Sequence, residues 1–306
     1  MATMIVFGAP DPEAALAERL ARGAGWTVAY ATVKGVRVHP GNAYAADDVP
    51  WAPGELPPDS IVLFECGGAP GTPGAVLEPG KRVTRLDHHR PGDPGYGRPP
   101  AEFLEASSVG QLLSLLARRG LLPRMEAGTR LDLAEGDLAF GDDRWQIGDG
   151  DMGAAVPPEI VMAAAADHCL EAAYRGLCPG VDPEALMRWR AESRAAFQKR
   201  PVADVLADVE SARRRLRAAV ERCDGARLEY ADFRGEHIPE LPEAACREGI
   251  AFLSTIRDRD GREKVILQAA PADLVRRFLA GEVVPGLQNV YGDPARGFAG
   301  GYTAAK

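Results

Sequence analysis

The chain has 306 residues, of which 46% are hydrophobic and 26% are charged, a composition typical of a folded protein long enough for two domains. Its formal net charge of −8 argues against duplex DNA as a partner, because duplex binders neutralise phosphates with basic surfaces. A small phosphorylated substrate held by metal ions stays open, because bound cations can outweigh the overall charge locally.

The N-terminus and the cysteines indicate a cytoplasmic protein without a membrane span. The first residues lack the basic segment and apolar core of a signal peptide, and no apolar run approaches ~20 residues. No two cysteines have CxxC spacing, so we expect free thiols in a reducing compartment. The cysteines are Cys66, Cys169, Cys178, Cys223 and Cys246.

The first half of the chain alternates apolar runs with helical and loop segments. One helix is expected at Pro12–Arg22, with Asp11 able to cap it, and another at Ser108–Arg119. This alternation predicts an α/β fold with a doubly wound, mainly parallel sheet. The expected strands are Met4–Phe7, Trp26–Val33, Ser60–Phe64 and Arg82–Leu86.

Helices dominate the middle of the chain. Pro157 and Pro158 introduce an expected helix from Glu159 to Arg175, and Asp182–Arg222 is helix-compatible except at Pro201. The run Arg213–Arg217 fits either phosphate binding or, as we favour, a solvated or domain-bridging helix face. The alternating acids of Gly148–Asp151 fit either a cation site or, as we favour, a turn.

After residue 222 the pattern changes to that of a smaller α/β domain. We expect a hairpin turn at Asp258–Gly261 and a glycine-rich loop at Gly297–Gly301. The predicted domains are 1–185 and 223–306, joined by a helical linker at 186–222. The expected strands are Arg227–Phe233, Ile250–Arg257 and Lys264–Ala269, and the expected helices are Glu240–Glu248 and Ala272–Ala280.

An acid and two adjacent histidines, Asp87-His88-His89, follow the fourth expected strand, at the edge where α/β sheets usually bind ligands. Acids also follow the first and third apolar runs. Another acid, Asp167, lies in an alanine-rich helix, where its burial without a partner would be costly. Taken alone, Asp11 fits a helix cap as well as a metal ligand, and Glu65 is merely an acid at the end of a strand. The chain order is Asp11 and Glu13, then Glu65, then Asp87-His88-His89, then Asp167.

This ordered set resembles the four motifs of the DHH phosphoesterase superfamily. That family includes single-strand exonucleases, oligoribonucleases, cyclic-dinucleotide phosphodiesterases and family II inorganic pyrophosphatases. The resemblance implies a DHH-like catalytic domain followed by an accessory domain that holds substrate across a cleft with its final glycine loop. The implied metal ligands are Asp11, Glu13, Glu65, His88 and Asp167.

The resemblance also implies roles in substrate binding. His89 is expected to contact the scissile phosphate and Asp87 to orient the histidines. Arg90, Gly300 and Gly301 are the expected substrate-binding residues. Mixed carboxylate and imidazole ligands suit one or two manganese ions, with magnesium or cobalt as alternatives.

The chain departs from the family at several positions. Phe7 stands where the family has a metal-binding histidine, and Glu13 and Glu65 stand where it has Asp. The final glycine segment lacks the family's histidine. His168, beside Asp167, is a candidate replacement ligand.

The sequence therefore predicts a metal-dependent phosphoesterase that acts on a small nucleotide or short oligonucleotide, with a homodimer as one possible state. The alternatives are a degenerate relative that binds a nucleotide or phosphorylated ligand without cleaving it, and a metalloenzyme adapted to another reaction.

Overall fold

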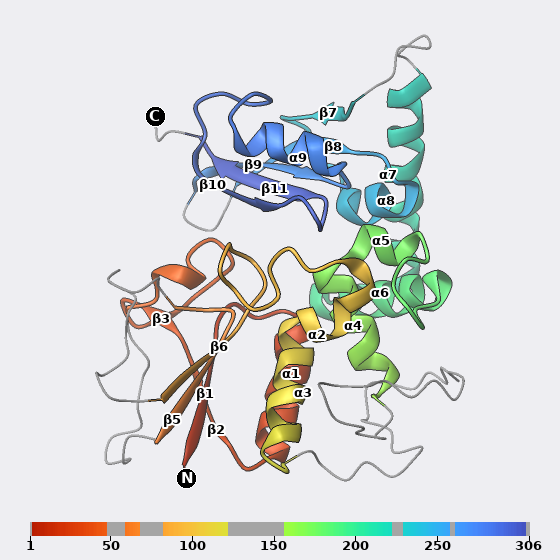
Figure 1. Cartoon of the computed structure of the whole chain (residues 1–306). Coiled ribbons are helices and arrows are strands. Elements are labelled where there is room, and N and C mark those ends of the chain that lie inside the picture. Colours follow the sequence, from red (N-terminus) through yellow and green to blue (C-terminus); the bar gives the residue numbers. More distant parts are fainter. Residues whose placement is uncertain are drawn as a thin grey trace. The chain divides into compact units, whose positions relative to one another are not determined.

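The computed structural model describes residues 2–47, 59–67, 82–121, 156–221, 229–257 and 261–303 (Figure 1). The chain divides into two compact units, one of residues 1–96 and 104–167 and the other of residues 97–103 and 168–306. The first contains a four-stranded parallel sheet and the second a five-stranded mixed sheet, so the expected α/β class is confirmed. The segment 186–222, expected as a linker, belongs to the second unit.

The parallel sheet of the first unit has the strand order β2-β1-β5-β6. Its central strands, β1 (Thr3–Phe7) and β5 (Ser60–Phe64), are buried along their whole length, as expected of parallel strands covered on both faces. The edge strands are β2 (Thr27–Tyr30) and β6 (Arg82–Leu86). Because all four strands are parallel, their carboxyl ends lie at one edge of the sheet.

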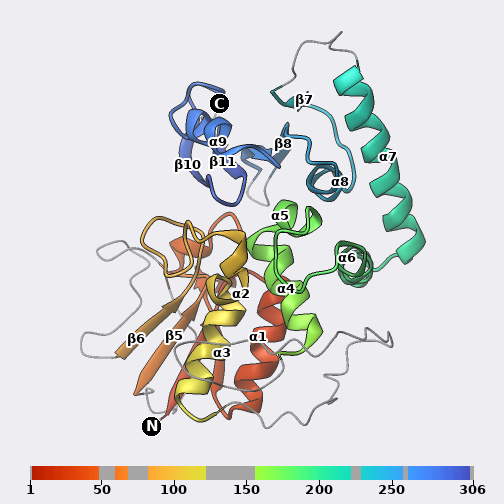
Figure 2. The same cartoon turned by 45° about the vertical axis from the view of Figure 1, so that its right-hand side comes forward.

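One face of this sheet packs against α1 (Pro12–Gly23) and α3 (Ser108–Arg118), which lie side by side in both views (Figures 1 and 2). Phe7 and Phe64 lie in this layer, with their ring centroids 5.1 Å apart. Two short turns, η2 (Pro100–Glu102) and α2 (Phe103–Ala106), precede α3.

The opposite face packs against residues 31–46. These form a hairpin of β3 (Thr32–Val33) and β4 (Val36–Arg37), followed by the 3-10 turn η1 (Ala43–Ala45). In the described part of the first unit, no α-helix covers this face, so the expected doubly wound arrangement is not seen there. The expected strand Trp26–Val33 is also wrong in part, because β2 ends at Tyr30 and Thr32–Val33 pairs with β4 instead.

The expected helix from Glu159 to Arg175 is interrupted. It consists of α4 (Pro158–His168) and α5 (Leu170–Tyr174), and Cys169 between them has the non-helical dihedrals φ −152° and ψ 50°. The division between the two units falls at the end of α4, directly after Asp167.

Two long helices follow in the second unit, α6 (Pro183–Gln198) and α7 (Val202–Glu221). They are separated by the left-handed residue Lys199 and by Pro201, as the proline predicted. On α7, Arg213 and Arg217 both pair with Glu248, so part of this arginine-rich run serves packing against α8 (Leu241–Glu248).

The mixed sheet of the second unit has the order β10-β11-β9-β8-β7, and α9 (Ala272–Leu279) contributes Leu274, Val275 and Phe278 to its core. The strands are β7 (Ala231–Phe233), β8 (Phe252–Arg257), β9 (Glu263–Gln268), β10 (Gln288–Asp293) and β11 (Phe298–Tyr302). Strands β8 and β9 form an antiparallel pair, whereas residues 258–260 of the expected hairpin turn lie outside the described residues.

The glycine-rich end is a strand, which corrects the expectation of a loop. Gly300 and Gly301 lie buried in β11, between β10 and β9. A Cβ on Gly300 would lie 2.6 Å from the Tyr291 hydroxyl oxygen, and one on Gly301 would lie 3.1 Å from the Leu287 Cβ. The space beside both glycines is thus filled by neighbouring side chains, and their role in substrate binding stays a prediction.

None of the helices in the described ranges is long and apolar enough to cross a bilayer. Among the described residues, Cys66, Cys169, Cys178 and Cys246 are buried and form no disulfide, and the Cys169 and Cys178 sulfurs lie 2.9 Å apart. Cys223 and the segment Gly148–Asp151 lie outside the described residues.

Candidate metal centre

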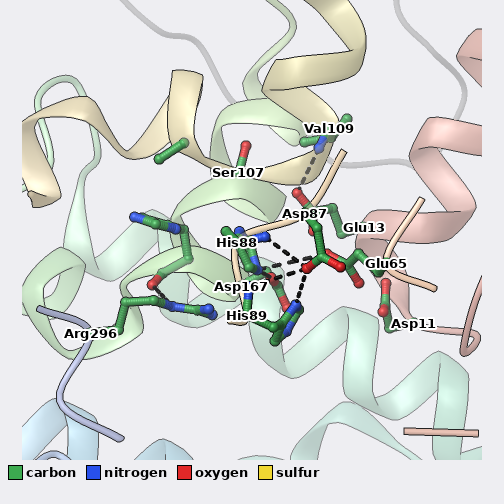
Figure 3. A network of polar contacts seen from close by, with 12 residues as sticks. Asp11, Glu13, Glu65, Asp87, His88, His89, Ser107, Val109, Asp167 and Arg296 are labelled. Atoms are coloured by element: carbon green, nitrogen blue, oxygen red, sulfur yellow. Dashed lines mark hydrogen bonds and ion pairs between the residues drawn. The ribbon is translucent and has the colours of Figure 1, made fainter. Parts of the chain in front are cut away.

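Three strands of the parallel sheet deliver the motif residues to its carboxyl edge. Asp11 and Glu13 follow β1, Glu65 directly follows β5, and Asp87-His88-His89 directly follows β6. Figure 3 shows these side chains gathered around Asp167, which comes from α4. Residues from four segments of the sequence therefore meet at one place in the first unit.

The centre of this assembly is a group of four side chains, Glu65, His88, His89 and Asp167. Each offers one ligand atom, and these atoms all lie within 4.8 Å of one another. His88 Nε2 is 2.8 Å from Asp167 Oδ2 and 3.7 Å from Glu65 Oε1. This mixture of imidazole and carboxylate donors is of a kind that binds divalent transition metals. The group is therefore able to hold a metal ion.

Asp11 and Glu13 lie beside this group and are also held by backbone N–H groups. Asp11 is the N-cap of α1, and its Oδ1 accepts a hydrogen bond of 2.7 Å from the Ala14 amide. Glu13 Oε1 accepts a bond of 2.9 Å from the Val109 amide at the N-terminus of α3. Asp11 thus caps α1, which was one of the two roles open to it, and the metal-ligand roles of Asp11 and Glu13 stay predictions.

Burial and mutual repulsion raise the pKa values of the carboxyl groups here. Burial and the charge of Asp167 raise the pKa of Asp11 to about 7. The same two causes hold the pKa of Glu13 well above its usual range, and burial followed by the charge of Glu13 does so for Glu65. Within the described chain, Glu13 Oε2 and Glu65 Oε1 accept no hydrogen bond. A divalent cation would offset this concentration of negative charge, so the residues present fit a metal ion.

Asp87 is the acceptor that organises the two histidines. Its Oδ1 accepts from the His88 amide at 2.8 Å, the His89 amide at 3.1 Å and His89 Nδ1 at 2.9 Å. Burial alone would raise the pKa of Asp87, but the hydrogen bond and charge of His89, with the charge of His88, lower it. The carboxylate is therefore ionised and holds the His89 proton on Nδ1. His89 Nε2 is left to contact substrate or metal.

Two further residues of this network were not predicted. The Tyr44 hydroxyl lies 3.0 and 2.9 Å from the two carboxyl oxygens of Asp87. Gln111 on α3 accepts from the Asp87 amide at 3.1 Å and donates to the Asp87 carbonyl at 3.0 Å. Gln111 could have been found from the sequence, because it lies on the apolar face of a predicted helix and a buried amide needs hydrogen-bond partners. No feature of the sequence indicates that Tyr44 belongs to this network.

The backbone around the site is tightly constrained. Glu65 has a φ of 51°, in the left-handed region that residues with a side chain rarely adopt. A Cβ on Gly8 would lie 2.3 Å from the Glu65 carbonyl oxygen. A Cβ on Gly95 would lie 1.9 Å from the Ala106 carbonyl oxygen and 2.7 Å from the His88 Cβ. Only glycine leaves room at these two positions for the chain segments that carry the site.

Gly95→Ala is expected to destabilise the fold by about 1–3 kcal/mol, because the Ala106 backbone and His88 must both move. It is also expected to weaken divalent-metal binding, because His88 is displaced. Urea denaturation and manganese titration measure the two effects. Gly23→Ala is the matched control, since a Cβ there meets nothing within 4 Å, and it should change stability by less than about 1 kcal/mol. Equal effects of both substitutions would contradict this role of Gly95.

The remaining expected residues lie outside the four-residue group. Arg90 is exposed, and its guanidinium carbon lies 3.5 Å from the centroid of the Tyr44 ring. His168 is buried in the second unit, where its Nε2 lies 3.4 Å from the Arg98 carbonyl oxygen. The carbonyl oxygen of His168 accepts a hydrogen bond of 2.6 Å from Arg296 Nε. The metal-capable group found among the described residues does not include His168.

The chain matches no protein-family model, no curated protein and no solved structure with which it was compared. Any assignment of function therefore rests on the site and on the motif resemblance.

Proposed function

We propose that this chain is a cytoplasmic, divalent-metal-dependent phosphoesterase of the DHH type, with manganese as its ion. Its substrate is a phosphoester or phosphoanhydride of a small nucleotide or short oligonucleotide. The observation that carries the proposal is the group Glu65, His88, His89 and Asp167 at the carboxyl edge of the parallel sheet. The ordered motifs of the sequence support the same class.

The side chains divide the work of such a reaction. Glu65, His88 and Asp167 would hold the ion, with Asp11 and Glu13 adding negative charge beside it. When bound, a divalent ion neutralises phosphoryl oxygens and activates water for attack. Asp87 keeps the proton of His89 on Nδ1, so that Nε2 faces the phosphate as a hydrogen-bond or proton partner.

A second candidate function is phospholigand binding without cleavage, and Phe7 favours it. The position of the first-motif histidine is filled by a phenylalanine that is 0% exposed and packs against Phe64. Position 7 therefore contributes a core side chain and no ligand. A centre limited to one ion by this loss is able to bind a phosphate yet lacks the second cation that helps to cleave it.

The experiment that separates these candidates is elemental analysis of the purified protein, followed by manganese titration with a generic phosphodiester and small nucleotides. One to two equivalents of manganese with metal-dependent phosphate release would support the phosphoesterase. Bound manganese without turnover of any substrate would support the binding protein. No metal uptake would contradict both.

The metal-free protein is expected to lose stability as the pH rises from about 4 to about 7. The pKa of Asp11 is about 7 in the folded chain and ordinarily 3.8, so the folded state retains a proton that the unfolded chain releases. One such group contributes a slope of at most about 1.4 kcal/mol per pH unit. Thermal unfolding of chelated protein at several pH values measures it, and manganese should remove the trend by favouring the carboxylate.

Asp11→Asn is the matched variant for this effect, because asparagine also caps helices but does not titrate. It should reduce the slope, with the remainder coming from Glu13 and Glu65. A chelated protein whose stability increases over this pH range would contradict the expectation.

A further inference from the structure

Tyr44 contacts two residues of the Asp87–Arg90 segment, the carboxyl group of Asp87 and the guanidinium of Arg90. It lies in the turn η1, more than forty residues before the Asp87-His88-His89 motif. Its hydroxyl contacts the carboxyl group of Asp87, which in turn holds His89 through Nδ1. Its ring lies under the guanidinium of Arg90. Tyr44 thus contacts both Asp87, which holds His89, and Arg90.

The backbone of Arg90 is held in place, and its side chain is exposed. Its backbone amide donates to Asp93 Oδ2 at 2.8 Å, which fixes the start of the loop. Within the described ranges, no carboxylate pairs with the guanidinium of Arg90, although the neighbouring Arg85 lies 3.4 Å from Asp93. An exposed guanidinium lying on an aromatic ring keeps its N–H donors directed outward in the ring plane.

This arrangement suits recognition of an anion. A guanidinium binds phosphate through two parallel N–H groups, and stacking reduces the freedom that it loses on binding. His89 is the residue expected at the scissile phosphate, and Arg90 follows it directly in the chain. An anion on Arg90 would therefore be a second group of the substrate, close to the phosphate that is cleaved.

We propose that Arg90, positioned by Tyr44, binds a second phosphate of the substrate beside the scissile phosphate. The inference rests on the proposed function and narrows its substrate class to nucleotides that carry at least two phosphates. Tyr44 is a positioning residue with two separable actions, since its hydroxyl acts on His89 through Asp87 and its ring acts on Arg90.

The test compares a nucleoside 3′,5′-bisphosphate with bis(p-nitrophenyl) phosphate, which carries a single anionic group. Arg90→Gln should raise KM for the bisphosphate by about 10- to 100-fold and leave KM for the diester within about twofold. Arg98→Gln is the control, because Arg98 is also an exposed loop arginine but pairs with Glu102. It should change neither KM. Equal changes for both substrates in Arg90→Gln would overturn the proposal.

Two substitutions of Tyr44 separate its actions. Tyr44→Phe keeps the ring under Arg90 and removes the hydroxyl, so kcat should fall for both substrates while KM for the bisphosphate is unchanged. Tyr44→Leu removes both, so it should also raise KM for the bisphosphate as Arg90→Gln does. A Tyr44→Leu variant that behaves like Tyr44→Phe would overturn the positioning of Arg90 by the ring.

Equilibrium binding distinguishes failure of this inference from failure of the proposed function. The bisphosphate and inorganic phosphate are titrated into wild-type and Arg90→Gln protein in the presence of manganese. If the wild type cleaves nothing, the phosphoesterase proposal fails, yet a preference for the bisphosphate that is lost in Arg90→Gln still supports the second-phosphate site. The absence of such a preference in the wild type overturns it.

Discussion

Replacing Asp167 with asparagine, or His88 with alanine, is expected to abolish metal-dependent turnover and to lower manganese affinity by at least about 100-fold. Loss of an outer partner of a metal ligand typically costs 10- to 100-fold, and a ligand itself should cost no less. His88 is 0% exposed, and its Nε2 lies 2.8 Å from Asp167 Oδ2, so both face the same point. Calorimetric titration with manganese and phosphate release measure the two effects.

The controls use the same residue types at exposed positions away from the site. Asp273→Asn and His237→Ala should leave manganese binding and turnover unchanged, because both residues are exposed. Circular dichroism of all four variants establishes that the fold persists. Undiminished turnover in both Asp167→Asn and His88→Ala would refute the location of the centre.

The strands that carry the site could be predicted closely from the sequence. Ser60–Phe64 and Arg82–Leu86 match β5 and β6 residue for residue, and β1 begins only one residue before the predicted start. Buried parallel strands form short apolar runs, which are visible without any tertiary information. Since Glu65 and Asp87 follow their strands directly, and Asp11 follows β1 after a short turn, parallel topology places them at one edge of the sheet.

The features that were missed depend on contacts between distant segments. The Cys169 interruption lies in an alanine-rich stretch that favours an unbroken helix by propensity. From the sequence, the glycine pair in β11 resembles a loop. The sequence around it does not show that Tyr291 and Leu287 fill the space beside these glycines. Tyr44 reaches Asp87 only through the packing of residues 31–46 on the sheet.

His89→Ala and Asp87→Asn are each expected to lower kcat by about 10²- to 10⁴-fold, the usual contribution of a positioned proton-transfer group. The two should act as one unit, because the Asp87 carboxylate fixes the tautomer and direction of His89 through a 2.9 Å bond to Nδ1. The double variant should therefore be no slower than the slower single variant. Steady-state kinetics on one phosphodiester with saturating manganese measures this cycle.

Manganese titration of the same variants decides what His89 does. His89 belongs to the metal-capable group of four, yet its Nδ1 is occupied by Asp87, so only Nε2 could take phosphate or metal as its partner. If Nε2 faces the phosphate, His89→Ala keeps the manganese affinity of the wild type and loses only kcat. A fall in affinity as large as that of His88→Ala would instead make His89 a ligand, and the phosphate would then need another partner.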